Sequence, residues 1–161
     1  MDTFSNILEW ILDKLKMIGA ACLVGMTFLT CADVVGRLFR HPIFGSVEIV
    51  SFMATLTIAM ALPYTHKSKG HVGVELLVRL LSARTQLIID ICTGILSFAL
   101  FSLVTWRMAL YGNTMYKSGQ VSMSLELPIH AIIFITSFCF FIFILIILQE
   151  IINNIRRLKS K

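Results

Sequence analysis

Long apolar stretches alternate along the chain with short segments that carry nearly all of its charge. Four uncharged windows cover residues 17–32, 49–65, 91–106 and 127–149. With its interfacial ends added, each window approaches the roughly 20 residues that an α-helix needs to cross the hydrocarbon core of a bilayer. The pattern therefore predicts four transmembrane helices, at about residues 17–39, 46–65, 86–107 and 127–149.

Two further segments have apolar residues at helical spacing but are too charged or too short to be spans. In residues 4–16 the apolar positions are Phe4, Ile7, Leu8, Ile11, Leu12 and Leu15. They predict an amphipathic helix that either lies on the cytoplasmic interface or extends the first span into the cytoplasm. A second helix, at about residues 72–82, is charged only at Glu75 and Arg79, and we expect it to lie in the plane of the same interface.

The fourteen Lys and Arg residues are divided unevenly between the segments that join the windows. Ten fall on one side of a four-span topology: Lys14, Lys16, Lys67, Lys69, Arg79, Arg84, Arg156, Arg157, Lys159 and Lys161. Four fall on the other side: Arg37, Arg40, Arg107 and Lys117. Because basic segments stay in the cytoplasm, both termini are expected to be cytoplasmic. Membrane lipid with anionic headgroups is a secondary expected contact of the basic side.

The composition supports a membrane protein and excludes most other classes. Of 161 residues, 57% are hydrophobic and 14% are charged, whereas about 25% are charged in an ordinary soluble domain. So few polar side chains cannot cover the surface of a soluble domain. We therefore expect residues 1–161 to form one all-α integral membrane domain, and we exclude soluble enzymes and nucleic-acid-binding proteins despite the net charge of +5.

The charged residues at the predicted outer ends of the spans suggest specific local structure. Asp33 and Arg37 are spaced i, i+4 with the acidic residue first, which is the favourable orientation for a pair on one helix. Ser46 is a candidate N-cap of the second span, and Glu48 in its first turn suits the helix dipole. Residues 108–125 are predicted to form the longest outer loop.

The sequence offers little material for catalysis or for binding a cofactor. No carboxylate lies at the centre of a window, and no Ser-His-Asp, H-E-x-x-H or P-loop pattern is present. The cysteines lie in or beside the apolar windows without metal-binding spacing; they are Cys22, Cys31, Cys92 and Cys139. We therefore expect no enzyme activity, no metal and no cofactor.

One alternative remains open: a membrane anchor of a respiratory enzyme, with haem or quinone between its helices. Haem ligation of this kind would need two histidines at one depth on facing helices. His66 and His71 fall on the cytoplasmic side, and His41 and His130 fall on the outer side. The outer pair could share a depth, but His41 stands in a turn before a proline.

Three short motifs, taken in order, resemble the small membrane (Q, DctQ-like) subunit of tripartite ATP-independent periplasmic transporters, the TRAP family. They are Asp33-Val-Val-Gly-Arg37, Gly45-Ser46-x-Glu48 and Gly70-His71-Val72-x-Val74-Glu75. Leu125-Glu126-Leu127-Pro128 before the last span is a further match. The similarity covers about residues 5–155.

This resemblance implies a function for the four-span unit. The Q subunit is a non-catalytic scaffold that pairs with a large M subunit, and the M subunit moves the substrate by an elevator-like motion driven by sodium. A periplasmic binding protein, P, captures a small organic anion and delivers it. The chain would then belong to the bacterial inner membrane.

The resemblance also implies roles for single residues. Arg37 and Glu48 would hold the outer end of the first helical hairpin and shape the surface on which the binding protein docks. His71 and Glu75 would fix the cytoplasmic loop against the partner or against lipid headgroups. The predicted partner or docking interface comprises Asp33, Arg37, Glu48, His71, Glu75 and Glu126.

Overall fold

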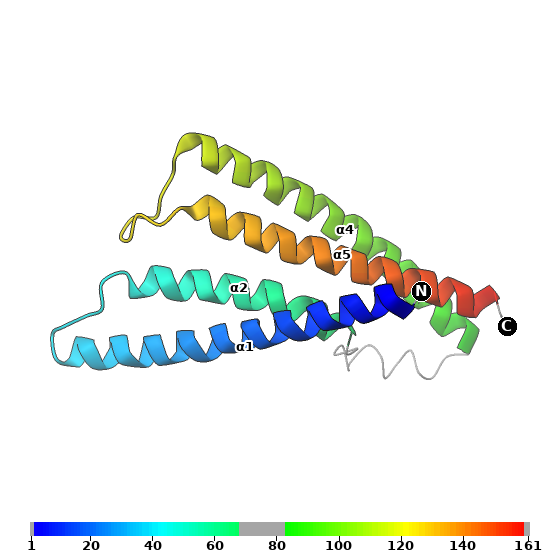
Figure 1. The fold of residues 1–161 in the computed structure, drawn as a ribbon, viewed down its shortest axis with the longest axis horizontal. Coiled ribbons are helices and arrows are strands. Elements are labelled where there is room, and N and C mark those ends of the chain that lie inside the picture. The colour runs from blue at the N-terminus through cyan, green and yellow to red at the C-terminus, as the bar shows by residue number, and fades with distance from the viewer. Residues whose placement is uncertain (1, 68–82, 160–161) are drawn as a thin grey trace.

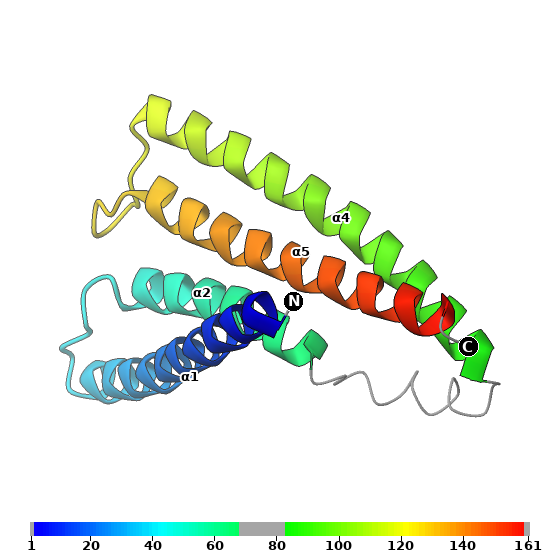
Figure 2. The ribbon, with the colours of Figure 1, turned by 45° about the vertical axis from the view of Figure 1, so that its right-hand side comes forward.

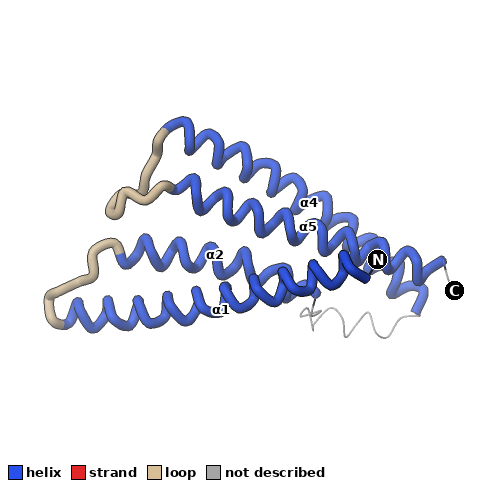
Figure 3. The backbone as a smooth tube through the Cα atoms, viewed as in Figure 1, coloured by secondary structure: helices blue, strands red, loops and turns tan. Residues whose placement is uncertain are grey.

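The computed structural model describes residues 2–67 and 83–159, and these residues are helical except for two connections (Figure 3). The helices are α1 (Asp2–Leu38), α2 (Ser46–Lys67), α4 (Ala83–Ser118) and α5 (Ile129–Lys159). All four are long and apolar enough to cross a membrane. The prediction of an all-α protein with four spans is therefore confirmed. The in-plane helix predicted at about residues 72–82, together with His71 and Glu75, lies outside the described residues.

The four helices lie side by side in the order α1, α2, α5, α4 (Figures 1 and 2). α1 and α2 form one antiparallel hairpin, α4 and α5 form a second, and contacts between α2 and α5 join the two. We call the end that carries the two hairpin connections the outer end, and the opposite end, where both termini lie, the inner end (Figure 1).

Packing between the hairpins is concentrated in the inner half of the molecule. One cluster of buried side chains brings all three of α1, α2 and α5 together; it comprises Leu8, Leu12, Leu15, Ala59, Met60, Cys139, Ile142 and Ile146. A second cluster joins Phe143, Ile147 and Ile151 of α5 to Phe98 and Phe101 of α4. α5 takes part in both clusters and is therefore the central helix.

The first of these clusters also shows where the amphipathic segment 4–16 belongs. It is the beginning of α1, which continues without interruption to Leu38. Leu8, Leu12 and Leu15 face α2 and α5, so this part of the apolar stripe is covered by protein. This geometry corresponds to the interpretation of the segment as an extension of the first span.

α4 is longer than predicted, because it continues past Arg107 to Ser118. The prediction of a loop was therefore wrong for residues 108–118. Gly112 does not break the helix because it lies against α5, where an added Cβ would be 3.2 Å from side-chain atoms of both Ile133 and Phe134. The helix ends at Ser118, and the next residue, Gly119, has a φ of 63°, the left-handed conformation that commonly follows the last turn of a helix.

The central position of α5 can be tested at Ile147, which is 0% exposed, against Ile135 on the same helix, which is 45% exposed. We expect Ile147→Ala to lower the melting temperature in detergent by about 5 °C or more, because the truncation leaves a cavity. Ile135→Ala should change it by less than about 2 °C. Differential scanning fluorimetry measures both shifts, and equal shifts would contradict the position assigned to α5.

Candidate functional site

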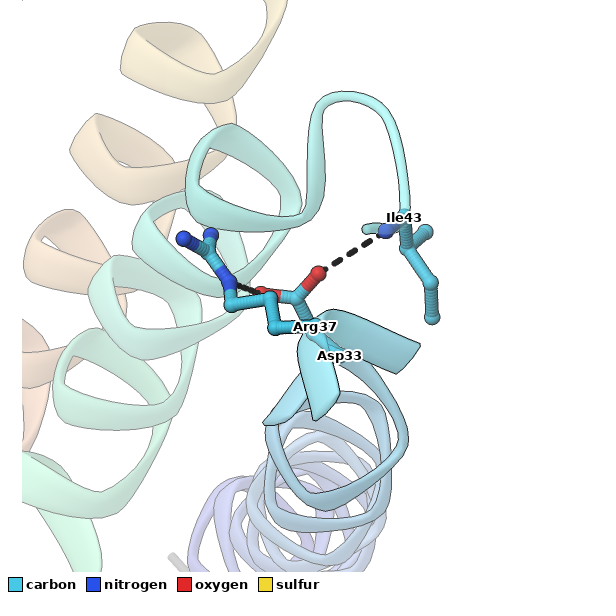
Figure 4. Close-up of polar contacts among 3 residues, drawn as sticks. All are labelled: Asp33, Arg37 and Ile43. Carbon is cyan, nitrogen blue, oxygen red and sulfur yellow. Dashed lines mark hydrogen bonds and ion pairs between the residues drawn. The ribbon is translucent and has the colours of Figure 1, made fainter. Parts of the chain in front are cut away.

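The buried carboxylate of Asp33 ties the end of α1 to the chain that leads into α2. Its Oδ2 accepts a hydrogen bond from Nε of Arg37 at 2.8 Å, and its Oδ1 accepts one from the backbone N–H of Ile43 at 2.9 Å (Figure 4). The predicted Asp33–Arg37 pair is therefore confirmed. We call Asp33, Arg37 and Ile43 the Asp33 cluster.

The turn between α1 and α2 is tight because the chain passes directly over Gly36. The backbone N–H of His41 donates to the carbonyl of Gly36 at 2.8 Å. A Cβ on Gly36 would come within 2.5 Å of the carbonyl oxygen of His41, so a side chain there would displace the turn. Arg40 takes the left-handed conformation, with a φ of 60°. The turn thereby brings Ile43 back toward Asp33.

A second carboxylate, that of Glu48 near the start of α2, organises the other outer connection. It accepts hydrogen bonds from Oγ of Ser122 at 2.7 Å, from N–H of Ser124 at 2.7 Å and from N–H of Leu125 at 3.1 Å. Oγ of Ser122 in turn accepts one from N–H of Leu127 at 3.2 Å. We call Glu48, Ser122, Ser124 and Leu125 the Glu48 cluster; it fastens the α4–α5 connection, residues 119–128, onto the first hairpin.

The start of α2 differs by one residue from the prediction. The carbonyl of Gly45 accepts the first helical hydrogen bond, from N–H of Ile49 at 3.1 Å, so Gly45 and not Ser46 occupies the N-cap position. Gly45 has a φ of 72°, and an added Cβ would lie 2.5 Å from Cγ of Leu125. Only glycine combines this conformation with this close approach. Ser46 is buried and interacts with the carboxylate of Asp33.

Glu126 is the last of the predicted site residues that the structure describes. Glu126 lies beside the Glu48 cluster in the left-handed conformation, with a φ of 53°, and its side chain is exposed. Such a conformation is uncommon for a residue other than glycine. The structure therefore brings Asp33, Arg37, Glu48 and Glu126 to the same outer end.

The inner end carries charged contacts that the sequence analysis missed. Nε2 of His66 lies 2.9 Å from Oε2 of Glu150, which joins α2 to α5. Nζ of Lys67 lies 2.7 Å from Oε1 of Glu9, which joins α2 to α1. Charges of opposite sign at the inner ends of three predicted helices were a signal for such pairs, but the register between the helices was not known.

The two outer histidines, both among the described residues, do not form the pair on facing helices that the haem alternative requires. The ring of His130 packs edge-on against Tyr116 and lies 6.5 Å from the ring of Phe134. His41 stands in the turn above Gly36. Within residues 2–67 and 83–159, His, Cys, Asp and Glu form no group of three or more that could hold a metal ion.

The comparison with protein families decides the identity of the chain. Residues 26–157 match the family of tripartite ATP-independent periplasmic transporters, DctQ component. The chain belongs to this family. No curated protein and no solved structure matches it. The match includes both outer clusters of this DctQ component, and with the four apolar helices it indicates a multi-pass protein of the inner membrane.

The Glu48 cluster predicts how the outer connection of this DctQ component responds to mutation. Glu48→Ala removes the acceptor of the amides of Ser124 and Leu125, so hydrogen exchange at these amides should accelerate by about tenfold or more. The amide of His41, which is bonded within the other connection, should keep its rate. Hydrogen–deuterium exchange followed by mass spectrometry measures the peptide that contains Ser124 and Leu125 and the peptide that contains His41.

Glu126→Ala is the matched control, because it removes a neighbouring carboxylate that takes no part in the cluster. In the Glu126→Ala variant, the amides of Ser124 and Leu125 should exchange at the same rate as in the wild type. Acceleration by Glu126→Ala as large as that by Glu48→Ala would show that the connection is not held through Glu48.

Proposed function

We propose that this DctQ component is the non-catalytic scaffold subunit of a sodium-driven TRAP transporter. It pairs with the large M subunit, and a periplasmic binding protein delivers a small organic anion to the assembly. The observation that carries the proposal is the family match over residues 26–157. The M subunit supplies the transport pathway, and the Q subunit holds the static part of the assembly in place.

The arrangement of the helices supports a scaffold role. At the inner end, the pairs His66–Glu150 and Lys67–Glu9 join α2 to α5 and to α1. At the outer end, the pair Asp33–Arg37 lies within α1. Between the ends, α4 presents large apolar side chains away from α5; they include Leu96, Leu100 and Leu103. Helices that are joined at their ends and expose apolar side chains between them suit lateral association with a larger membrane protein.

The outer clusters support a role in docking the binding protein. The Asp33 and Glu48 clusters set the shape of both outer connections, and they leave Met123 fully exposed and Glu126 open to solvent on the loop that Glu48 holds. We assign Asp33, Glu48 and Glu126 of the predicted interface to this surface, and Arg37 contributes to its shape through the bond to Asp33. For His71 and Glu75, which lie outside the described residues, we keep the expectation of a contact with the M subunit or with lipid headgroups.

Purification of the tagged chain from its native membranes in a mild detergent tests the pairing. We expect one large polytopic membrane chain to copurify, identified by mass, and a visible spectrum without a Soret band. A Soret band, or a copurifying flavin or iron–sulfur subunit, would instead support the respiratory anchor.

Charge reversal at Glu48 tests the function of the outer end. Glu48→Arg places a cation among three hydrogen-bond donors, so we expect uptake of the transported anion to fall by about tenfold at equal membrane abundance. Asp13→Arg is the control for charge reversal, because Asp13 is exposed near the inner end of α1 and lies outside the proposed docking surface, so uptake should stay at the wild-type level. Copurification of the M subunit with the Glu48 variant distinguishes a docking defect from an assembly defect, and unchanged uptake would refute the role.

A further inference from the structure

The guanidinium of Arg37 is held from one side and open on the other. Only its Nε is bonded to Asp33, and both terminal nitrogens point away from the carboxylate (Figure 4). The side chain of Arg37 is 57% exposed, whereas that of Asp33 is 10% exposed. The buried carboxylate therefore fixes an exposed cation without covering its two terminal nitrogens.

This geometry prepares Arg37 for an oxoanion. The second oxygen of Asp33 is occupied by the backbone N–H of Ile43, so the carboxylate cannot turn to meet the guanidinium with both oxygens. The planar guanidinium binds phosphate and carboxylate through pairs of parallel N–H groups, and a guanidinium already fixed in position loses less entropy on binding. Arg40, exposed in the same turn, adds a second positive charge to this part of the surface.

Large apolar side chains stand close to Arg37 in the sequence, at the outer end of the first hairpin. The exposed ones are Val34, Val35, Leu38, Phe39 and Phe44. Phe44 is 75% exposed and directly follows Ile43, the residue bonded to Asp33. Arg37 and these apolar residues lie at the outer limit of the candidate span Leu8–Leu38, so charge and apolar surface meet where a bilayer changes from headgroups to acyl chains.

We propose that Arg37 binds the phosphate of a glycerophospholipid in the outer leaflet, whose acyl chains cover Leu38, Phe39 and Phe44. A phospholipid matches both parts of the surface, because it supplies an oxoanion for the guanidinium and hydrocarbon for the apolar side chains. A free anion would leave the apolar side chains uncovered. The site belongs to this chain alone and is independent of the proposed pairing with an M subunit.

The test uses the full chain purified in detergent and titrated with 1-palmitoyl-2-oleoyl-phosphatidylglycerol, with bound lipid counted by native mass spectrometry. We expect Arg37→Gln to weaken the binding of one lipid by about tenfold, the effect of losing a charge-assisted contact. The control is Arg107→Gln, which removes an exposed arginine from the other hairpin and should change the affinity by less than about twofold. Dioleoylglycerol, which lacks the phosphate, and glycerol 3-phosphate, which lacks the acyl chains, should not bind at the same concentrations.

Arg37→Lys keeps the charge but lacks the planar pair of donors, so it should lose affinity by several-fold and still fold, as judged by its helical circular dichroism. Wild-type lipid affinity in Arg37→Gln or in Arg37→Lys would overturn the proposal. Binding of glycerol 3-phosphate as tight as that of the phospholipid would identify a free-anion site instead. Wild-type lipid binding in an Arg37→Gln variant that no longer copurifies its membrane partner would show that Arg37 contacts protein.

Discussion

The carboxylate of Glu48 is the constraint on which the outer half of the structure depends. Two antiparallel hairpins are joined mainly along α2 and α5, so nothing in the hairpins themselves fixes the distance between their outer connections. A charged group at the edge of the hydrocarbon region has to be paired or hydrated. Glu48 is satisfied by donors that lie 74, 76 and 77 residues away along the chain. Since all three donors belong to one connection, the same contacts that satisfy the charge also position that connection over the first hairpin.

Charged contacts at the inner end complete this arrangement in a different way. There the hairpins already share a buried apolar cluster, and the pairs His66–Glu150 and Lys67–Glu9 lie close to it in sequence and in space. Exposed pairs of this kind add little stability by themselves. They connect α2 to α5 and to α1 at defined positions along the helices. The outer end has no comparable apolar cluster among the described residues, and its geometry therefore rests on the hydrogen bonds that Asp33 and Glu48 accept.

The sequence predicted the features that depend on local pattern. Long uncharged apolar windows located four spans, and i, i+4 spacing located the Asp33–Arg37 pair, because both are properties of a single helix. It did not predict that Ser122 and Leu125 meet Glu48, since that contact depends on how two hairpins pack. The length of α4 was missed for the same reason. Gly112 and the polar residues after Arg107 favour a loop locally, but the close packing of Gly112 on Ile133 and Phe134 favours a helix.

The separation of polar ends from apolar faces also limits what can bind to each part of the molecule. Apolar side chains such as Leu100 and Leu103 offer no hydrogen bonds, so a lateral neighbour gains specificity from shape, or is simply lipid. The outer connections offer backbone groups and charges whose positions are set by two carboxylates, so a soluble partner would meet a defined polar surface there. On the proposed function, the chain acts through this geometry: it fixes where the M subunit lies and where the delivered substrate arrives.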